Sequence, residues 1–573
     1  MSAVRYRIYS WLRGLSLLAG LNAVIAAAAS PASIQTNDQD MVSASGLLNI
    51  GKPGEAIRLL EALRARDPGN VAATRLLARA YLRSEQADAA IAVLQQILTK
   101  QPGAPQELYG LGLAHAMKHE ADAAFEWFGK AKATRKFDMT TLQSDKHLDF
   151  LHPDPRFAAL LPVAADFANP FVENVKIIAE WDGEHANDQF GWIARSLGDI
   201  DGDGIPDFVT SAPTSAAGGE QSGRVYVYST RSHKLLWSTD GKTGDQLGSG
   251  VESAGDTDGD GVQDVIASAP GAAAAYVYSG KDGRVLLTVR GENKDDNFGN
   301  HVASAGDIDH DGHADFISGA PNNGAGGKDA GRAYVYSGKD AHVLLTLTGA
   351  DPGDQFGSAV TGYSDGRRTL LVIGAPGAGP QHTGRVYIYD GLTQKPKFTF
   401  DADASGNKLG YMFLAVLGDV DGDGTPDIYA SDWSNAAKGP ATGRIYVLSG
   451  KTGKLLFART GQTAGEGFGT THAFAGDIDH DGRADLVVGS WQYAGAAISG
   501  GRAYLYSGKT GALLKTYTDR IPGDTFGFDA IALGDVDGDG SSDLLITAAW
   551  SGVHGFHSGR VFVISSGIEA ASH

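Results

Sequence analysis

Apolar and polar positions follow two different rhythms along this chain of 573 residues. Between about residue 40 and residue 135, apolar side chains recur three and four positions apart, which predicts amphipathic helices. From about residue 172 onward, short alternating runs such as 331–336 (GRAYVY) predict strands separated by glycine-rich turns. We therefore predict a multidomain protein with a small all-α domain at 35–165, a linker at 166–174 and an all-β domain at 175–567.

The helical part repeats itself every 34 residues. The recurring positions are Ala56, Leu60, Leu63 and Pro68, then Ala90, Leu94, Ile97 and Pro102, then Ala124, Phe128 and Ala131. Small residues where helices cross, with proline at the turn, resemble the tetratricopeptide repeat. We expect the segment 142–161 to cover the last apolar face of the array. An ordinary helical bundle is the alternative.

The β part repeats every 51 to 59 residues, and each of its seven units begins with an apolar residue followed by glycine. These pairs are Phe190-Gly191, Leu247-Gly248, Phe298-Gly299, Phe356-Gly357, Leu409-Gly410, Phe468-Gly469 and Phe526-Gly527. Each unit holds four strand-like segments, which together predict a seven-bladed β-propeller. The last unit lacks a fourth strand, so we expect the strand-like run 175–181 to complete it and close the ring.

Six of the seven units carry an acidic loop of nine residues, with Asp at positions 1, 3, 5 and 9 and Gly at position 6. Calcium prefers six or more oxygen ligands, and several of them are commonly carboxylates. Carboxylates at positions 1, 3, 5 and 9 and the backbone carbonyl at position 7 supply such a set. The predicted metal ligands are therefore Asp199, Asp201, Asp203, Ile205 and Asp207; Asp256, Asp258, Asp260, Val262 and Asp264; Asp307, Asp309, Asp311, His313 and Asp315; Asp419, Asp421, Asp423, Thr425 and Asp427; Asp477, Asp479, Asp481, Arg483 and Asp485; and Asp535, Asp537, Asp539, Ser541 and Asp543.

The alternative for these loops is a set of exposed acidic turns without metal, because Asp and Gly are common turn residues. Turns alone do not require four aspartates at one fixed spacing, so the repetition favours calcium. The fourth unit departs from the pattern. Its loop is three residues shorter, it begins at Asp365, and it carries Arg367 and Arg368, so we predict no metal there.

The apolar-Gly pairs, acidic loops and Ala-Pro strand ends together resemble the FG-GAP repeats of integrin alpha subunits and related bacterial secreted proteins. The resemblance covers roughly residues 172 to 567. It implies calcium in the hairpin between strands 1 and 2 of a blade, and partners on the opposite face, which is built from loops 2–3 and 4–1. No domain is inserted between the units, so the ligand-binding module of some integrins has no counterpart.

The N-terminal segment and the composition indicate the cellular compartment of the protein. Three arginines precede an apolar stretch at 15–29 that ends in small residues, which predicts a secretory signal peptide at 1–29. A retained membrane anchor is the alternative. The formal net charge of −19 disfavours nucleic acid as a partner. Cysteine is absent, so calcium, rather than disulfides, is the expected staple of an exported chain.

Catalytic motifs are weak by comparison. Residues 362–366 satisfy the GxSxG string of hydrolases, but that motif needs a helix after the serine and a strand-like run follows here. Trp433, Trp491 and Trp550 stand where earlier units carry Ala-Pro. Exposed aromatic rings on neighbouring blades suit sugar or peptide binding, whereas buried rings would pack between blades.

These observations predict an exported calcium-binding protein, in the periplasm, at the cell surface or outside the cell. We expect it to be non-catalytic and to serve adhesion or scaffolding. Its partners would be a protein or carbohydrate on the upper face of the propeller and a peptide in the groove of the helical repeats. A calcium-dependent enzyme that cleaves polysaccharides, a lyase or a hydrolase, is the alternative.

Overall fold

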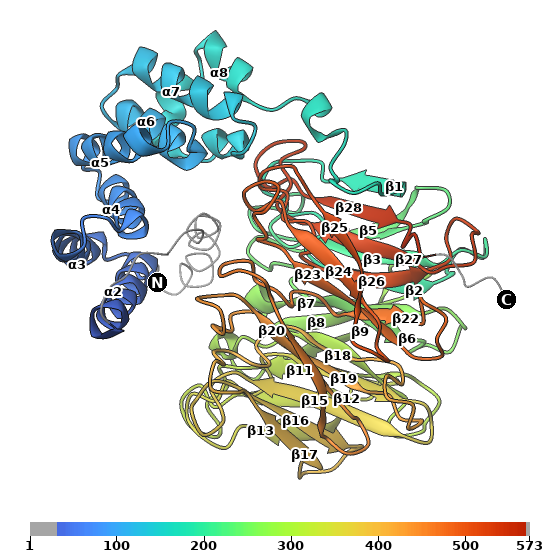
Figure 1. The fold of residues 1–573 in the computed structure, drawn as a ribbon. Helices are drawn as coiled ribbons and strands as arrows, with labels where there is room; N and C mark the ends of the chain where they lie inside the picture. Colours follow the sequence, from blue (N-terminus) through green and yellow to red (C-terminus); the bar gives the residue numbers. More distant parts are fainter. Residues whose placement is uncertain (1–30, 569–573) are drawn as a thin grey trace. The chain divides into compact units, whose positions relative to one another are not determined.

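The computed structural model describes residues 31–568, which form two compact units, one helical and one all-β (Figure 1). The predicted signal peptide at 1–29 lies outside the described residues. No helix within 31–568 combines the length and the apolar character needed to cross a bilayer.

Antiparallel helices build the first unit, and each one packs on the next along the chain. The helices are α2 (Pro31–Asn49), α3 (Pro53–Arg66), α4 (Val71–Arg83), α5 (Ala87–Lys100), α6 (Pro105–Met117) and α7 (Ala121–Ala133), followed by η1 (Met139–Gln143), η2 (Lys146–Leu151), α8 (Pro155–Leu160) and η3 (Ala164–Phe167). Gly112 shows why small residues recur at the crossings, because a Cβ there would lie 2.5 Å from the ring of Phe128. Leu148 and Phe157 of the closing segment are buried against α7, as the sequence predicted.

The second unit is a ring of seven antiparallel sheets with four strands each, which confirms the predicted propeller. Blades 1 to 3 are β2 (Ala194–Gly198), β3 (Asp207–Ala212), β4 (Arg224–Tyr228) and β5 (Leu235–Asp240); β6 (Val251–Gly255), β7 (Asp264–Ala269), β8 (Ala274–Tyr278) and β9 (Val285–Arg290); and β10 (Val302–Gly306), β11 (Asp315–Ala320), β12 (Arg332–Tyr336) and β13 (Val343–Thr348). Blades 4 to 6 are β14 (Val360–Ser364), β15 (Thr369–Ala375), β16 (Arg385–Asp390) and β17 (Phe398–Asp401); β18 (Leu414–Val416), β19 (Ile428–Asp432), β20 (Arg444–Leu448) and β21 (Leu455–Thr460); and β22 (Phe474–Gly476), β23 (Asp485–Ser490), β24 (Arg502–Tyr506) and β25 (Leu513–Thr518).

Blade 7 joins the two ends of the ring. It contains β26 (Ala530–Gly534), β27 (Asp543–Ala548), β28 (Arg560–Ile564) and the early strand β1 (Ile177–Asp182), which lies beside β28 in Figure 1. Trp181 pairs with Val561, so the predicted closure by the early strand is confirmed. Phe171, inside the predicted linker, is also buried and packs on Phe526 and Phe562.

The apolar-Gly pairs hold neighbouring blades together. Phe356, for example, is buried and forms an isolated parallel bridge with Gly331 of the preceding blade. Gly331 has φ of +86°, and a Cβ there would lie 2.2 Å from the carbonyl oxygen of Phe356. Gly357, the glycine of the pair itself, has φ of +87°, and a Cβ there would lie 2.2 Å from the carbonyl oxygen of Arg332. Only glycine fits either contact without displacing backbone.

Candidate metal centres

Each acidic loop connects the first two strands of its blade, where the resemblance to FG-GAP repeats placed it. In blade 1 the loop joins β2 to β3, and it is held by hydrogen bonds from its own backbone. Asp199 accepts from the amides of Gly202 (2.8 Å), Asp203 (3.0 Å) and Gly204 (2.8 Å). Gly204, at position 6, has φ of +87°, which favours glycine. The loop thus folds around its first carboxylate.

The same arrangement recurs in the other acidic loops. In blade 7 the amides of Gly538, Asp539 and Gly540 donate to Asp535, at 2.8 to 3.1 Å. The position-6 glycines all have φ between +79° and +90°: Gly204, Gly261, Gly312, Gly424, Gly482 and Gly540. The six loops therefore share the same left-handed turn at position 6.

Carboxylate oxygens converge within these loops. In blades 1, 2 and 3, the aspartates of positions 1, 3 and 5 place one oxygen each within 4.8 Å of one another. In blades 5 and 6, the aspartates of positions 1, 3 and 9 do so. Clustered anionic oxygens are the donor set that calcium prefers, so the residues present fit this ion. The carbonyls of position 7 remain predicted ligands.

The aspartate at position 9 also has a second task that the sequence did not reveal. Asp207 is fully buried, and its Oδ2 accepts the amides of Ile200 (3.0 Å) and Asp201 (3.3 Å). Its Oδ1 accepts the amide of Thr230, in the turn between strands 3 and 4. This carboxylate therefore ties the acidic loop to the neighbouring hairpin, and its remaining lone pairs are available to an ion.

Burial raises the pKa of this position-9 carboxyl throughout the ring. The pKa reaches about 6 in Asp207, Asp315, Asp427 and Asp485. In blade 7 the turn between strands 3 and 4 is absent because the early strand β1 takes the fourth place. There the Oδ1 of Asp543 has no hydrogen-bond partner among the described residues, and burial raises its pKa to about 7.

Blade 4 differs as predicted from its sequence. Only Asp365–Arg368 separate β14 from β15, and the amides of Arg367 and Arg368 donate to Asp365 at 2.9 and 2.8 Å. These bonds hold the pKa of Asp365 below its usual range. The guanidinium of Arg368 instead donates to the carbonyl of Gly424 in the acidic loop of blade 5. The absence of metal from blade 4 stays a prediction.

Ser364, the serine of the GxSxG string, ends strand β14, and strand β15 follows the turn. Its hydroxyl donates to the carbonyl of Asp307 at 2.8 Å. The serine therefore lacks the strand–turn–helix setting of a hydrolase nucleophile, and its hydroxyl connects blade 4 to the acidic loop of blade 3.

The three tryptophans are buried, with 3 to 6% of their surface exposed. The rings of Trp491 and Trp550 meet edge to face, with centroids 4.8 Å apart, and Trp491 also contacts Phe528. This packing matches the alternative in which large aromatic residues fill the space between blades. A ligand-binding role for Trp433, Trp491 and Trp550 stays a prediction.

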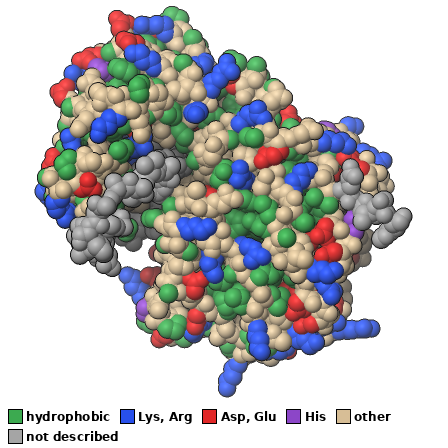
Figure 2. Space-filling view, viewed as in Figure 1, with side chains coloured by type: hydrophobic (Ala, Val, Ile, Leu, Met, Phe, Trp, Pro, Cys, Tyr) green, Lys and Arg blue, Asp and Glu red, His purple; other side chains and the backbone are tan. Residues whose placement is uncertain are grey.

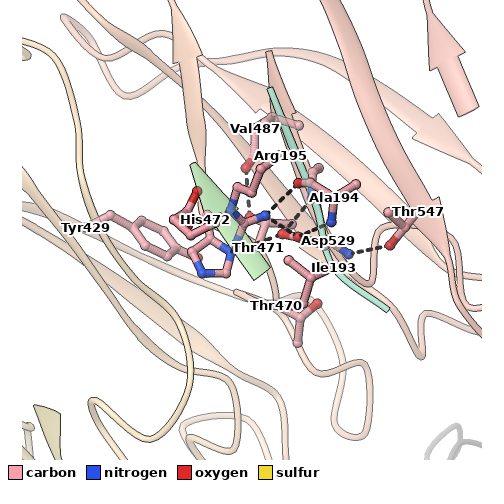
Figure 3. Close-up of polar contacts among 12 residues, drawn as sticks. Ile193, Ala194, Arg195, Tyr429, Thr470, Thr471, His472, Val487, Asp529 and Thr547 are labelled. Atoms are coloured by element: carbon pink, nitrogen blue, oxygen red, sulfur yellow. Dashed lines mark hydrogen bonds and ion pairs between the residues drawn. The ribbon is translucent and has the colours of Figure 1, made fainter. Parts of the chain in front are cut away.

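One cluster of charged residues was missed by the sequence. Arg195 of β2 is 5% exposed, and its guanidinium contacts Asp529 and His472 (Figure 3). It also donates to the carboxylate of Glu252 at 2.8 Å. Asp529 is fully buried. Burial alone would raise the pKa of Asp529, but the charges of Arg195 and His472 hold it well below its usual range.

The cluster joins blades that are distant in sequence, since Arg195 and Asp529 are separated by 334 residues. Each residue lies shortly after the apolar-Gly pair of its own blade. A charged side chain at this place in a strand of otherwise small or apolar residues was the available signal. Its partners could not be assigned without the order of blades around the ring.

Comparison with known proteins agrees with this architecture. The tetratricopeptide repeat family matches residues 48–111, and the FG-GAP repeat family matches residues 190–228, 298–336 and 528–564. The chain is 30% identical to integrin alpha-4 of Xenopus laevis over 38% of the chain and 22% of the relative. It is 31% identical to integrin alpha-PS5 of Drosophila melanogaster over 33% of the chain and 20% of the relative.

A third similarity is to the phosphatidylinositol-glycan-specific phospholipase D of Rattus norvegicus, at 32% identity over 23% of the chain and 18% of the relative. The matched segments thus span about a fifth of the length of these relatives. The likeness concerns a repeated module and not the whole of any relative. The chain carries FG-GAP repeats closed into a seven-bladed β-propeller, preceded by a tetratricopeptide repeat region.

Proposed function

We propose that this chain is an exported, calcium-binding protein that acts by binding partners and not by catalysis. The observation that carries the proposal is the sixfold repetition of one acidic loop in a closed ring, each loop folded around its first aspartate. Six independent copies of this geometry are more than surface turns need, and the donor set suits a hard divalent cation.

The ions would be held by the carboxylates of positions 1, 3 and 5, with position 9 and the carbonyl of position 7 completing the set. Calcium supplies positive charge that offsets the repulsion among clustered carboxylates. The aspartate at position 9 would then connect each ion to the hairpin between strands 3 and 4. The bound ions would stabilise the propeller and would take part in no reaction.

The interaction surfaces we propose are loops 2–3 and 4–1 of the propeller and the groove of the helical repeats. Similarity to integrin alpha subunits and the presence of a tetratricopeptide repeat support this assignment. On the face shown in Figure 2, acidic and basic side chains are interspersed, without the continuous basic stripe that is typical of nucleic-acid binding. A protein or carbohydrate ligand therefore fits best, in the periplasm or outside the cell.

Calcium titration of the purified protein tests the proposal first. We expect about six ions per chain by isothermal titration calorimetry. Replacing Asp199 and Asp201 with Asn should remove one site, whereas Asp365→Asn in blade 4 should remove none. Retention of six ions in the loop variant, or no binding at all by the wild type, would contradict the assignment.

The second test concerns partners. Protein pull-downs and glycan arrays should be run with calcium and with EDTA, and we expect a ligand that is retained only with calcium. The enzymatic alternative has one supporting observation, the similarity to a segment of a phospholipase D. Incubation with plant and bacterial polysaccharides, followed by assays for new reducing ends or unsaturated products, separates the two functions. Turnover of any polymer would overturn the non-catalytic proposal.

A further inference from the structure

Every acidic loop is contacted by a basic side chain from outside the loop, and the loop of blade 5 is contacted by a second one, Arg368 of blade 4. In blades 1, 2, 3, 5 and 6 one such side chain comes from the turn between strands 3 and 4. The contacts are Arg231 to Asp203 (3.7 Å), Arg284 to Asp258 (2.6 Å), Lys339 to Asp311 (3.8 Å), Lys451 to the carbonyl of Asp423 (3.4 Å) and Lys509 to Asp481 (4.0 Å). The partner is an aspartate of position 3 or 5 in every case, so the contact is a regular feature of the acidic blades.

Blade 7 provides an independent instance. It lacks a turn between strands 3 and 4, because its fourth strand is β1 from the beginning of the propeller. Lys176, the residue before β1, nevertheless places its ammonium 2.6 Å from Asp537, 361 residues away. The base is therefore present even where the turn that supplies it elsewhere is missing.

Blade 4 provides the opposite case, since it has no acidic loop. Its turn between strands 3 and 4 also carries lysine, but Lys397 pairs with Asp390, the last residue of β16, at 2.8 Å. In the six acidic blades, a basic side chain contacts the hairpin between strands 1 and 2. In blade 4, where this hairpin is not acidic, Lys397 pairs with a neighbouring residue of its own hairpin. The acidic loop, and not the turn, is what the base accompanies.

These ion pairs are too exposed to contribute much stability to the fold on their own. The side chains of Lys176 and Arg284 are 64% and 52% exposed. Solvent screens exposed pairs of this kind, so their Coulomb attraction contributes little to the stability of the fold. The positive charge of the base has a larger effect on a calcium ion bound in the same loop. The base repels a divalent ion twice as strongly as it would repel a monovalent ion at the same distance.

We propose that these six bases are counter-ion arms: they neutralise part of each loop when calcium is absent, and the positive charge that they place beside the loop aspartates opposes calcium binding there. The inference rests on the calcium binding proposed above. The arms (Lys176, Arg231, Arg284, Lys339, Lys451 and Lys509) would weaken each site and protect the empty ring from the repulsion of its own loops. They would thus set the calcium concentration at which the propeller becomes loaded.

The test compares two triple variants with the same change in net charge. The arm variant carries Lys176→Gln, Arg284→Gln and Lys339→Gln. The control variant carries Lys294→Gln, Lys328→Gln and Lys397→Gln, which remove exposed propeller lysines that make no ion pair with an acidic loop. Calorimetric titration gives the calcium dissociation constants, and thermal melting in EDTA gives the stability of the empty ring.

We expect the arm variant to bind calcium about two- to tenfold more tightly at three of its sites, because each loses one unit of repulsion. In EDTA it should melt below the wild type, so the two readouts move in opposite directions. The control should match the wild type in both. If the arm variant melts at a lower temperature but binds calcium no more tightly than the wild type, the arms are ordinary ion pairs and the inference is wrong.

Equal tightening in the control variant would also overturn it, because the cause would then be net charge. Wild-type protein that binds no calcium would contradict the proposed function itself, and this outcome is distinct from a wild type that binds calcium with the same affinity as the arm variant.

Discussion

Blade 4 and the six acidic blades share four strands and differ in one hairpin. In blade 4 strands β14 and β15 pair without a break, from Val360 opposite Ile373 to Ser364 opposite Thr369. In blades 1, 2, 3, 6 and 7 the same ladder shifts register just before the acidic loop, as between Ser196 and Gly198 in blade 1. The bulge is thus present in five of the six acidic blades and absent from blade 4, whereas in blade 5 the pairing from Leu414 to Val416 keeps one register.

Blade 4 distinguishes the features that form the ring from the acidic loops that the ring carries. Blade 4 shows that a blade assembles with a tight turn and no cage of carboxylates. The strands and the contacts between the apolar-Gly pairs and the preceding blade therefore build the propeller, and the acidic loops are additions at its 1–2 hairpins. Stability that depends on calcium should be located in the six acidic blades alone.

The largest expected effect comes from breaking the four-stranded sheet that all blades share, here in blade 7. Deletion of residues 31–182 removes β1 and leaves β28 with an open edge in blade 7. We expect the remaining chain to lose its cooperative thermal transition and to aggregate, because unpaired strand edges associate. Melting followed by circular dichroism measures the transition. A deletion variant that melts as the wild type does would show that closure by β1 is dispensable.

Breaking the buried cluster that joins distant blades is next in size. Asp529→Asn leaves the guanidinium of Arg195 with one fewer anionic partner inside the protein. Removing one member of a buried ion pair costs about 3 to 5 kcal/mol, so we expect a loss of this order in urea unfolding. The matched control is Asp365→Asn in blade 4, where the carboxylate is exposed and its loss should leave unfolding unchanged. Equal behaviour of the two variants would contradict the role of the cluster.

An exchange of hairpins between blades tests whether an acidic blade keeps its fold when it carries the short turn of blade 4. Replacing residues 419–427 of blade 5 with the shorter turn of blade 4 should preserve the ring and remove one calcium ion. The stabilisation by calcium should fall by about one sixth, because each site adds to stability by mass action. Calorimetric titration and melting with and without calcium measure both quantities. Failure of the chimera to fold would mean that the acidic hairpin is part of the architecture after all.

The smallest effect concerns pH. Burial, with the charges of His472 and Arg195, lowers the pKa of His301 to about 3. The folded protein therefore binds fewer protons at this site than the unfolded chain between pH 6.5 and pH 3, and stability is lost as the pH falls through this window. We expect His301→Gln to show a flatter decline in melting temperature between pH 7 and pH 4.5. Parallel declines in both proteins would contradict this assignment.

Local repetition made much of this fold predictable. The spacing of the apolar-Gly pairs indicated the number of blades, and the strand-like run 175–181, which has no partner in its own unit, indicated the closure. Both signals are periodic in sequence, so neither needed the three-dimensional arrangement. The shortened loop at Asp365 was visible for the same reason.

Features that depend on neighbours across blades were not predictable in this way. The position-9 aspartate appeared as one more ligand, and its hydrogen bond to the next hairpin depends on how strands 2 and 3 pair. Lys176 gave no sign of its contact with Asp537, because the two residues come from opposite ends of the propeller. Exposure of Trp433 or Trp491 also depends on the spacing between blades, which the sequence does not state.

Thermal melting with calcium and with EDTA tests the central claim most directly. At calcium concentrations 100 times the dissociation constant, each site stabilises the folded state by about 2.7 kcal/mol, so the propeller transition should rise well above its value in EDTA. The helical signal at 222 nm from residues 31–169 should keep its own midpoint. A propeller transition at the same temperature in both buffers would contradict the claim that these six loops hold calcium.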